Sequence, residues 1–327
     1  MQYKVFNGHS DYALKVYHEQ LMGNHSDLKD NYLPLMKKGG VQVEVFQVGG
    51  DFSMPGGGLD GHDTITCLKI LEANLAQIRA NPDDFYLITN ADQLRSAREN
   101  SKRGIIFSME GVTALSAGPQ MLSVFYELGL RSIALTHNRK NVFADGCAEL
   151  ESNGGLSNSG KDLIRKINEL NMMLDLVHIN ARSFFQALEI YEHAPIVSHS
   201  NANALYNHFR NLSDEQIRAI GERGGVVGVN FIAAFIRKDT QAATTEDVVD
   251  IIEHIAGLIG IDHVGIGPDF IEYFTNKQPY VKGLEDPTGI PLLADALERR
   301  GYSKADIDKI MFDNFARVFS QVLKDTN

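Results

Sequence analysis

The sequence has little cysteine. Cys67 and Cys147 are the only two in 327 residues, and they lie far apart in the chain. Two distant thiols cannot form a disulfide framework or a cysteine-based zinc site, because both need several closely spaced cysteines. The first residues, MQYKVFNGHSD, also lack the basic segment, apolar stretch and cleavage site of a signal peptide. We therefore expect reduced thiols and a cytoplasmic location.

Long apolar runs and clustered positive charge are absent as well. No run approaches the roughly 20 apolar residues that a membrane-spanning helix needs. Lys and Arg number 31 against 42 Asp and Glu, which gives a formal net charge of −11, and the basic residues are dispersed. A nucleic-acid-binding domain usually carries a basic patch. We expect a small-molecule partner, with no nucleic acid and no membrane bound.

Motifs of several enzyme classes are missing. The Gly-rich stretch GGDFSMPGGGLDGHD, residues 49–63, lacks the Gly-Lys-Ser/Thr ending of a phosphate-binding loop and the spacing of a dinucleotide fingerprint. No His-Glu-x-x-His occurs, and Ser198 and Ser200 flank His199 without forming a Gly-x-Ser-x-Gly elbow. We interpret residues 49–63 as a rim loop beside an active site.

Short apolar runs alternate with helical patterns along the chain. Nearly continuous apolar segments are typical of strands buried on both faces of a parallel sheet, because crossover helices cover the outside. The pattern predicts an α/β fold, a TIM-like (β/α)8 barrel that forms a single domain over residues 1–327. Two extra C-terminal helices are expected within residues 287–323. The predicted strands are residues 3–9, 41–47, 104–109, 131–136, 172–177, 195–198, 225–230 and 263–267. The predicted helices are residues 24–38, 63–80, 90–101, 119–128, 159–170, 180–192, 213–223 and 244–258.

Side chains that bind metals or move protons stand at the ends of these apolar runs. All parallel strands of a closed barrel end at one rim, which is where such enzymes place their active sites. Scattered core histidines would not be expected at the same end of so many strands. The residues at these ends are His9, Asp11, Glu110, His137, His178, His199 and Asp269.

The spacing of these residues favours a site for two cations. His9 and Asp11 are two residues apart, so an extended strand directs both to the same face. Glu110 has two carboxylate oxygens and can bridge two cations, while His178 and His199 offer imidazoles to the second. Nitrogen and oxygen ligands without sulfur suit zinc, and also manganese, cobalt or iron. A water shared by two such cations gives a hydroxide near neutral pH.

Several longer stretches resemble a known family. Their order and spacing are similar to those of the membrane dipeptidase, or renal dipeptidase, family of zinc metallopeptidases, and the soluble bacterial type in particular. The resemblance covers nearly the whole chain. The stretches are GHSD (8–11), GGVQVEVF (39–46), MEGVTAL (109–115), YELGLRSIALTHNRKNVFAD (126–145), GLSNSGKDLIRKINELNMMLDLVH (155–178), PIVSHSNANAL (195–205), RNLSDEQIRAIGERGGVVGVNF (210–231), VGIGPDF (264–270) and NFARVF (314–319).

The resemblance implies a role for each candidate residue. It implies two Zn²⁺ per chain, the first bound by His9 and Asp11, the second by His178 and His199, and both by Glu110. It implies that His137 contacts the scissile region of the substrate and stabilises the oxyanion, and that Arg210 binds the substrate carboxylate. Asp269 matches the residue that moves the proton between the attacking water and the leaving amine. The implied function is hydrolysis of dipeptides, and the implied assembly is a homodimer.

Two departures from the family bear on the substrate. Phe270, Ile271 and Glu272 follow Asp269 where relatives commonly have Phe-Asp-Gly. Tyr12, Ala13 and Leu14 follow Asp11 where a small polar or Pro-containing turn is more usual. The sequence leaves open the side chains and the stereochemistry of the dipeptide, including a D-residue at its C-terminus.

Two other functions remain as alternatives. An amidohydrolase-like barrel acting on a cyclic amide, lactone or β-lactam usually shows His-x-His rather than His-x-Asp at its first strand. A metal-free barrel kept as a binding module would be expected to have lost at least one ligand, and all five are present.

Overall fold

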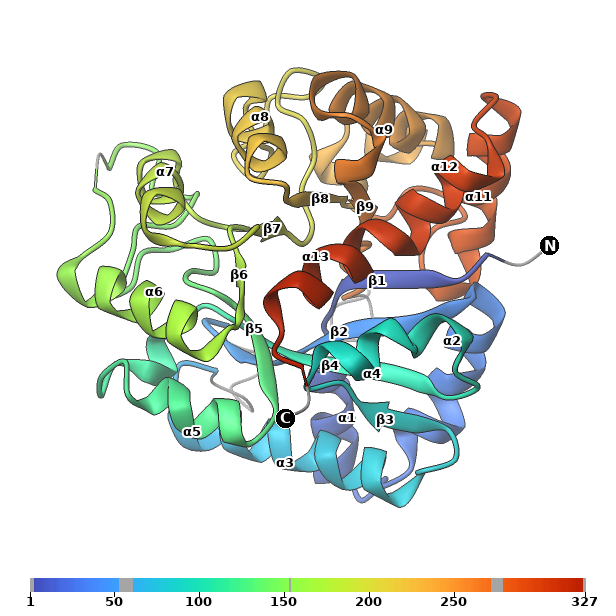
Figure 1. The fold of residues 1–327 in the computed structure, drawn as a ribbon. Helices are drawn as coiled ribbons and strands as arrows, with labels where there is room; N and C mark the ends of the chain where they lie inside the picture. Colours follow the sequence, from blue (N-terminus) through green and yellow to red (C-terminus); the bar gives the residue numbers. More distant parts are fainter. Residues whose placement is uncertain (1–2, 53–60, 153, 272–278, 326–327) are drawn as a thin grey trace.

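The computed structural model describes residues 3–52, 61–152, 154–271 and 279–325, and Figure 1 shows its course. Eight parallel strands form a closed barrel, because β1 pairs with both β2 and β9, and β2 also pairs with β4. A further short strand, β3, pairs with β4 beside the ring. The strands are Val5–Ser10 (β1), Val41–Gly50 (β2), Phe85–Leu87 (β3), Arg103–Glu110 (β4), Leu130–Ala134 (β5), Met173–Asp175 (β6), Ile196–Val197 (β7), Val226–Val229 (β8) and Val264–Ile266 (β9). The predicted TIM-like barrel is confirmed.

The helices form an outer ring around the barrel (Figure 1). Several begin at side-chain caps: Ser157 before α6, Asn180 before α7 and Ser213 before α8 each accept a backbone hydrogen bond. The α-helices are Tyr12–Leu21 (α1), Leu33–Gly39 (α2), Thr64–Ala80 (α3), Ala91–Arg95 (α4), Met121–Glu127 (α5), Asn158–Leu170 (α6), Ala181–Ile190 (α7), Asp214–Glu222 (α8), Thr245–Ile259 (α9), Ile290–Arg299 (α11), Lys304–Asp308 (α12) and Asn314–Val322 (α13).

The C-terminal helices close one end of the barrel. A π-helical segment, Lys309–Asp313, joins α12 to α13 into one helical run. Phe6, near the start of β1, stacks on Phe315 at 5.4 Å and also contacts Phe319 of α13. This run therefore covers the end where the strands begin (Figure 1), and it leaves the opposite rim for the site. The expectation of extra C-terminal helices is confirmed.

The rows of apolar residues predicted as strands are buried on both faces. All ten residues of β2 and all six of β1 are buried. The predicted strands match the barrel strands within a few residues, whereas α1 and β3 were not predicted. No helix among the described residues is both long and apolar enough to cross a membrane.

Candidate metal centre

The five predicted metal ligands meet at the rim where the strands end. His9 lies near the end of β1, Glu110 is the last residue of β4, and His178 and His199 follow β6 and β7. Ligand atoms within 4.8 Å of one another form three groups: His9 with Asp11 and Glu110, Glu110 with His178 and His199, and His9 with His199 and Asp269. Glu110 belongs to the first two groups, as a bridging carboxylate should.

Glu110 lies at the centre of these ligands. Its Oε1 is 2.9 Å from Nε2 of His178 and 3.3 Å from Nε2 of His199. The same oxygen is 3.9 Å from Nε2 of His9, which in turn lies 3.7 Å from Oδ1 of Asp11. Glu110 and the three histidines are buried. One carboxylate oxygen thus faces three imidazole nitrogens, which belong to residues at or just beyond the ends of three different strands.

The hydrogen bonds around His178 favour a cation between the ligands. Nδ1 of His178 lies 2.9 Å from Oδ1 of Asn138, and an amide oxygen only accepts, so the ring proton is on Nδ1 and Nε2 carries a lone pair. That Nε2 lies 3.0 Å from Nε2 of His199. Nε2 of His9 and Oε1 of Glu110 are buried without a hydrogen-bond partner. Such atoms normally destabilise a fold by about 1–3 kcal/mol each, so this inward-facing set fits metal ions well.

Burial sets unusual pKa values in this cluster in the absence of metal. Burial raises the pKa of Glu110 to about 8 from an ordinary value of 4.5. Burial lowers the pKa of His178 and of His199 well below 6.5, so both rings stay neutral. Burial also acts to lower the pKa of His9, but the nearby carboxylates of Glu110, Asp11 and Asp269 outweigh it and raise the value to about 10. His178 and His199 are therefore already neutral, as metal ligation requires, whereas Glu110 and His9 would each release a proton when a metal binds.

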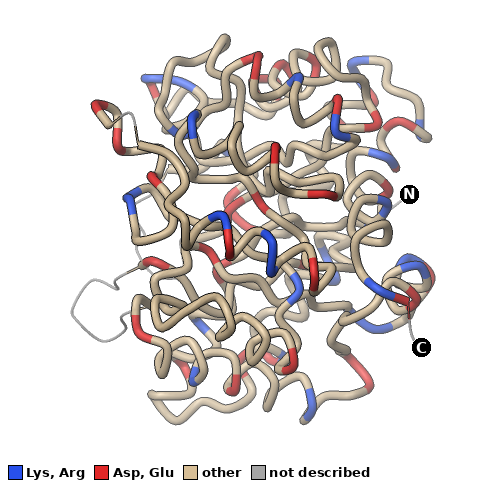
Figure 2. Tube along the Cα trace, turned by 60° about the vertical axis from the view of Figure 1, so that its left-hand side comes forward, with Lys and Arg blue, Asp and Glu red and all other residues tan. Residues whose placement is uncertain are grey.

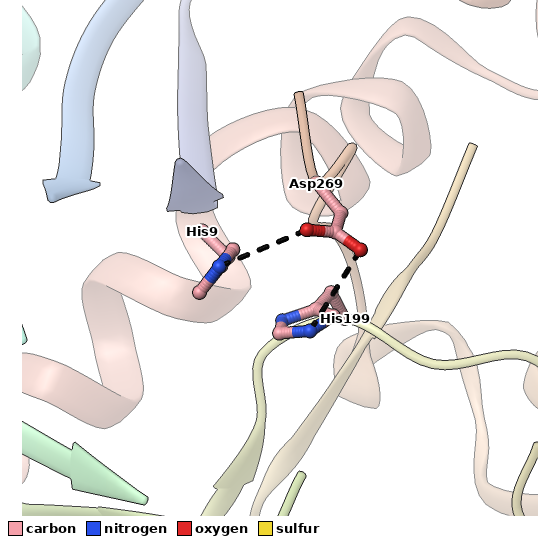
Figure 3. A group of neighbouring side chains, drawn as sticks. All are labelled: His9, His199 and Asp269. Atoms are coloured by element: carbon pink, nitrogen blue, oxygen red, sulfur yellow. Dashed lines mark ion pairs between the residues drawn. The ribbon is translucent and has the colours of Figure 1, made fainter. Parts of the chain in front are cut away.

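Asp269 lies beside the same cluster, after β9. Figure 3 shows its two oxygens directed to different histidines: Oδ1 is 3.8 Å from Nε2 of His9, and Oδ2 is 3.9 Å from Nε2 of His199. Asn230 donates from Nδ2 to Oδ2 of Asp269 at 2.9 Å. Burial raises the pKa of Asp269. A carboxyl group with a raised pKa close to the metal ligands is suited to accepting and returning a proton.

The backbone at Asp269 is held in an uncommon conformation. Its φ is +63°, a left-handed value that residues other than glycine rarely adopt. Tyr280 stabilises it, because the phenol donates to the Asp269 carbonyl at 2.5 Å and accepts from the Ile271 amide at 2.6 Å. Left-handed residues of this kind are often found at functional sites. Glu272, part of the departure from the family, lies outside the described residues.

His137 and Arg210 line two different cavities near the candidate metal ligands. His137 follows β5, its ring is 4.5 Å from that of His178, and Nδ1 donates to the Asp51 carbonyl at 3.0 Å. It lines a cavity of about 790 Å³ together with Asp51 and Phe52. Those two residues belong to the Gly-rich stretch, so its described part does lie at the rim, while residues 53–60 are outside the described residues.

Arg210 lines a second cavity, of about 280 Å³, together with His178. Only 6% of Arg210 is exposed. Its guanidinium lies 5.6 Å from the centre of the Phe235 ring and donates a long hydrogen bond, 3.4 Å, to the His199 carbonyl. No Asp or Glu within the described ranges forms an ion pair with it. A buried cation without a carboxylate partner is suited to an anionic ligand.

The sequence did not point to the residues that hold these side chains. Asn230 contacts Asp269, Asn138 contacts His178, and Ser198 lies 2.9 Å from Nδ1 of His199. Asn230 and Asn138 are ordinary polar residues with no recognisable motif. Ser198 was noted only because it flanks His199.

Comparison with known proteins identifies the family. The family described as "Membrane dipeptidase (Peptidase family M19)" matches residues 1–327. The chain belongs to this family. Among curated relatives, dipeptidase tcpJ of Claviceps purpurea is 32% identical over 73% of this chain, and the match spans 56% of that fungal protein's length.

Solved structures of the family share the fold closely. The crystal structure of dipeptidase AC, a metallopeptidase of the same family, has a TM-score of 0.87 at 28% identity and covers 99% of both chains. A metallopeptidase from Rhodobacter sphaeroides has a TM-score of 0.86 at 27% identity, over 98% of this chain and 100% of that one. The latter was solved with a phosphinate mimic of the dipeptide L-Ala-D-Ala.

Proposed function

We propose that this chain is a metal-dependent dipeptidase with two zinc ions at the rim of its barrel. The observation that carries the proposal is the cluster of five ligands, in which Glu110 Oε1 lies between the histidines of both candidate sites. Membership of the family and the dipeptide mimic bound by the Rhodobacter enzyme support the same activity.

The ligands divide between two positions. His9 and Asp11 would hold the first zinc, His178 and His199 the second, and Glu110 would contact both. Bound there, the zinc ions would supply an activated water near neutral pH and polarise the scissile carbonyl. Other divalent metals with the same ligand preference would fit the site.

Asp269 performs the proton transfers in this proposal. Its Oδ2 is occupied by the Asn230 amide, so Oδ1 is the oxygen that takes the proton from the attacking water. The same oxygen returns that proton to the nitrogen of the leaving amine as the peptide bond breaks. The same carboxyl group therefore acts first as the general base and then as the general acid.

Arg210 and His137 position the substrate. The guanidinium of Arg210 binds the C-terminal carboxylate of the dipeptide inside the cavity that it shares with His178. His137 stabilises the oxyanion, and its hydrogen bond to the Asp51 carbonyl leaves Nε2 as the ring nitrogen that faces the substrate. Because Nδ1 already donates to a carbonyl, Nε2 can donate to an oxyanion only when the ring is doubly protonated. Burial lowers the pKa of free His137, so the ring is neutral before the substrate binds and would take this second proton from solvent as negative charge develops on the substrate oxygen.

A dipeptide explains Arg210 better than a cyclic substrate does. Lactones and cyclic amides do not require a free carboxylate next to the scissile bond, and they would leave this buried guanidinium without a directly paired carboxylate. The experiment is a hydrolysis screen of the metal-loaded protein over dipeptides of mixed stereochemistry, with their C-terminal amides and a set of lactones and cyclic amides alongside. We expect free dipeptides to be cleaved, and chelation to abolish the activity reversibly. Turnover of the cyclic set alone would refute the proposal.

A further inference from the structure

A bulge near the end of β1 contains the candidate ligand His9. Asn7 pairs with Glu44 of β2. Three residues later along β1, Ser10 pairs with Phe46, which is only two residues further along β2. The strand therefore has one extra residue in the stretch around His9. Such bulges turn side chains toward active sites, but they also interrupt the ladder of backbone hydrogen bonds. We therefore expect side chains to hold this stretch in place.

Asn7 is the first of these side chains. Its Oδ1 accepts from the His9 backbone amide at 3.1 Å. A backbone amide only donates, so the side-chain atom next to it is the oxygen, and Nδ2 is the atom directed at Glu44. That Nδ2 donates to Oε1 of Glu44 at 2.7 Å. Asn7 and Glu44 are both 0% exposed. One side chain thus ties the backbone of His9 to a buried carboxyl group.

Tyr32 is the second. It ends the π-helical segment Leu28–Tyr32 between α1 and α2, and its hydroxyl donates to the same Oε1 of Glu44 at 2.6 Å. Because that hydroxyl has one proton, it can only accept from Oγ of Ser10, which lies 3.4 Å away. The Ser10 oxygen in turn accepts from the backbone amide of Tyr12 at 3.3 Å. Asp11 lies between the two residues that this last bond joins.

Tyr12 itself packs against this network. It is one of the residues at which the chain departs from the family pattern, and its ring stacks on that of Tyr32, with centroids 3.6 Å apart and 15° between the planes. Both rings are buried. A small polar residue at this position could not form the stack. The start of α1, directly after Asp11, is therefore packed on the same tyrosine that bonds to Glu44.

We propose that Glu44 positions the first metal site by holding the segment His9–Asp11 through Asn7 and Tyr32. It is a positioning residue, since it belongs to none of the three groups of candidate ligands. The role requires an acceptor at Oε1 and no particular charge, because Oε2 has no hydrogen-bond partner among the described residues. The inference rests on the metal site of the proposed function and adds the support of one of its two positions.

Three variants separate this role from a general loss of packing. Tyr32→Phe removes one hydroxyl and keeps the ring that stacks on Tyr12. Glu44→Leu removes the acceptor at similar volume, whereas Glu44→Gln keeps an acceptor oxygen for both hydrogen bonds. Tyr191→Phe is the matched control. Tyr191 is as deeply buried as Tyr32, and its hydroxyl also makes two hydrogen bonds, both to the backbone at the start of β6, at the end of the barrel opposite the rim.

The measurements are zinc affinity, by competition with a chelator that resolves the two equivalents, and folding, by circular dichroism. We expect one equivalent to bind roughly 10- to 100-fold more weakly in Tyr32→Phe and in Glu44→Leu, the usual effect of removing a residue that supports a metal ligand. Glu44→Gln and Tyr191→Phe should keep both affinities. In a His199→Ala background, where the remaining equivalent is assigned to the first site, Tyr32→Phe should weaken that equivalent by the same factor.

Two results would overturn the role of Glu44. One is that folded Tyr32→Phe and Glu44→Leu proteins retain both affinities. The other is a loss in Glu44→Gln as large as that in Glu44→Leu, because charge and not hydrogen bonding would then set the affinity. An unmodified protein that binds no zinc would instead overturn the proposed function on which the inference rests.

Discussion

At the scale of single residues, Asp269 differs from the other acidic groups of the site in how its oxygens are engaged. Oδ2 accepts from Asn230, whose own Oδ1 accepts from the Ile232 amide at 2.7 Å, so the amide cannot rotate without losing a bond. Oδ1 is therefore the oxygen open to the reaction. Glu110, by contrast, has Oε1 surrounded by imidazoles. The two carboxyl groups are thus suited to different tasks, proton transfer and metal binding.

The substitution Asp269→Asn keeps the shape of the side chain and removes the base. We expect the variant to fold and to retain both metals, while kcat falls by roughly 10²- to 10⁴-fold, the usual contribution of a general acid–base group. The measurement is kcat together with metal content. A variant with its metals in place and near-normal turnover would show that another group carries the proton.

Arg210→Ala should separate substrate binding from chemistry. If the guanidinium binds the C-terminal carboxylate, its loss should lower kcat/KM for free dipeptides by roughly 10- to 100-fold, the value of a charge-assisted hydrogen bond. C-terminal amides, which lack that charge, should be affected much less. Arg182→Ala is a suitable control, because Arg182 lines the same cavity but is exposed on α7. Equal losses on acids and amides would assign Arg210 a structural role.

Glu110→Ala should show whether one carboxylate serves both metals. Because Oε1 faces His9 as well as His178 and His199, its removal should lower occupancy at both positions, whereas His199→Ala should mainly empty the second. The number of metal equivalents per chain in the purified variants tests whether Glu110 binds both metals. Two full equivalents in Glu110→Ala would contradict the bridging assignment.

At the scale of elements, the barrel could be predicted because its strands are apolar throughout and end in chemically distinctive residues. Two elements escaped prediction for physical reasons. Helix α1 begins directly after Asp11, which occupies the N-cap position but makes no side-chain cap, since its carboxylate lies among the candidate metal ligands. Strand β3 has only three residues and lies outside the closed barrel, where it pairs with β4 alone. Two of its residues are partly exposed, so it is too short to stand out as a buried apolar run in the sequence.

The partners of the site residues could not be predicted from the sequence. Asn230 and Asp269 are 39 residues apart, Asn138 and His178 are 40, and Asp175 and Ser198 are 23. Each pair comes together only through the register of neighbouring strands and the turn that follows. A polar residue near a strand end has many such partners available to it until that register is known.

The rim also depends on glycines that let the strands approach one another. A Cβ on Gly228, in β8, would lie 2.0 Å from the Ser198 carbonyl oxygen, which belongs to the backbone just before His199. Gly228→Ala should therefore displace that segment, destabilise the fold by about 1–3 kcal/mol and weaken the second metal site. The measurements are thermal unfolding and zinc affinity.

Gly257→Ala provides the matched comparison. Gly257 is exposed in α9, and a Cβ there would have no heavy atom within 4 Å. The substitution should stabilise the protein by roughly 0.5–1 kcal/mol, because alanine favours the helix, and leave metal affinity unchanged. A Gly228→Ala variant that behaves in the same way would show that β8 and the His199 segment are not closely packed.

At the scale of the whole molecule, charge is distributed differently on the surface and at the rim. Figure 2 shows basic and acidic residues interspersed along the chain, while the net charge is −11. The site concentrates Asp11, Glu110 and Asp269 around buried histidines. Two divalent cations would offset this local excess of acid. The homodimer and the cytoplasmic location stay predictions.

Removing the metals should make folding stability depend on pH in a defined direction. Glu110 has a folded-state pKa near 8 against an ordinary 4.5, so the folded protein binds its proton more tightly and loses stability as pH rises between these values. His9, with a pKa near 10 against 6.5, loses its contribution as pH rises from 6.5. His178 and His199 act oppositely, but only below 6.5, because their folded-state pKa values are depressed. Between pH 6.5 and 8 Glu110 and His9 therefore both contribute to the decline, and buried Glu44, whose pKa burial raises to about 7, adds to its first part.

The metal-free protein should thus become less stable as pH rises from 6.5 to 8, whereas the zinc-loaded protein should change little. Bound zinc keeps Glu110 ionised and His9 neutral, so neither residue binds a proton in the folded, zinc-loaded protein. The free energy of zinc binding also stabilises the folded state. The difference in Tm between the two forms should consequently widen across this interval, by about 2–4 °C for each 1 kcal/mol. Scanning calorimetry of chelated and zinc-loaded samples measures it. Metal-free Glu110→Gln, which lacks the titrating carboxyl, should show a shallower decline than the metal-free parent. A Tm difference that narrows toward pH 8 would mean that these buried groups do not hold the protons assigned to them.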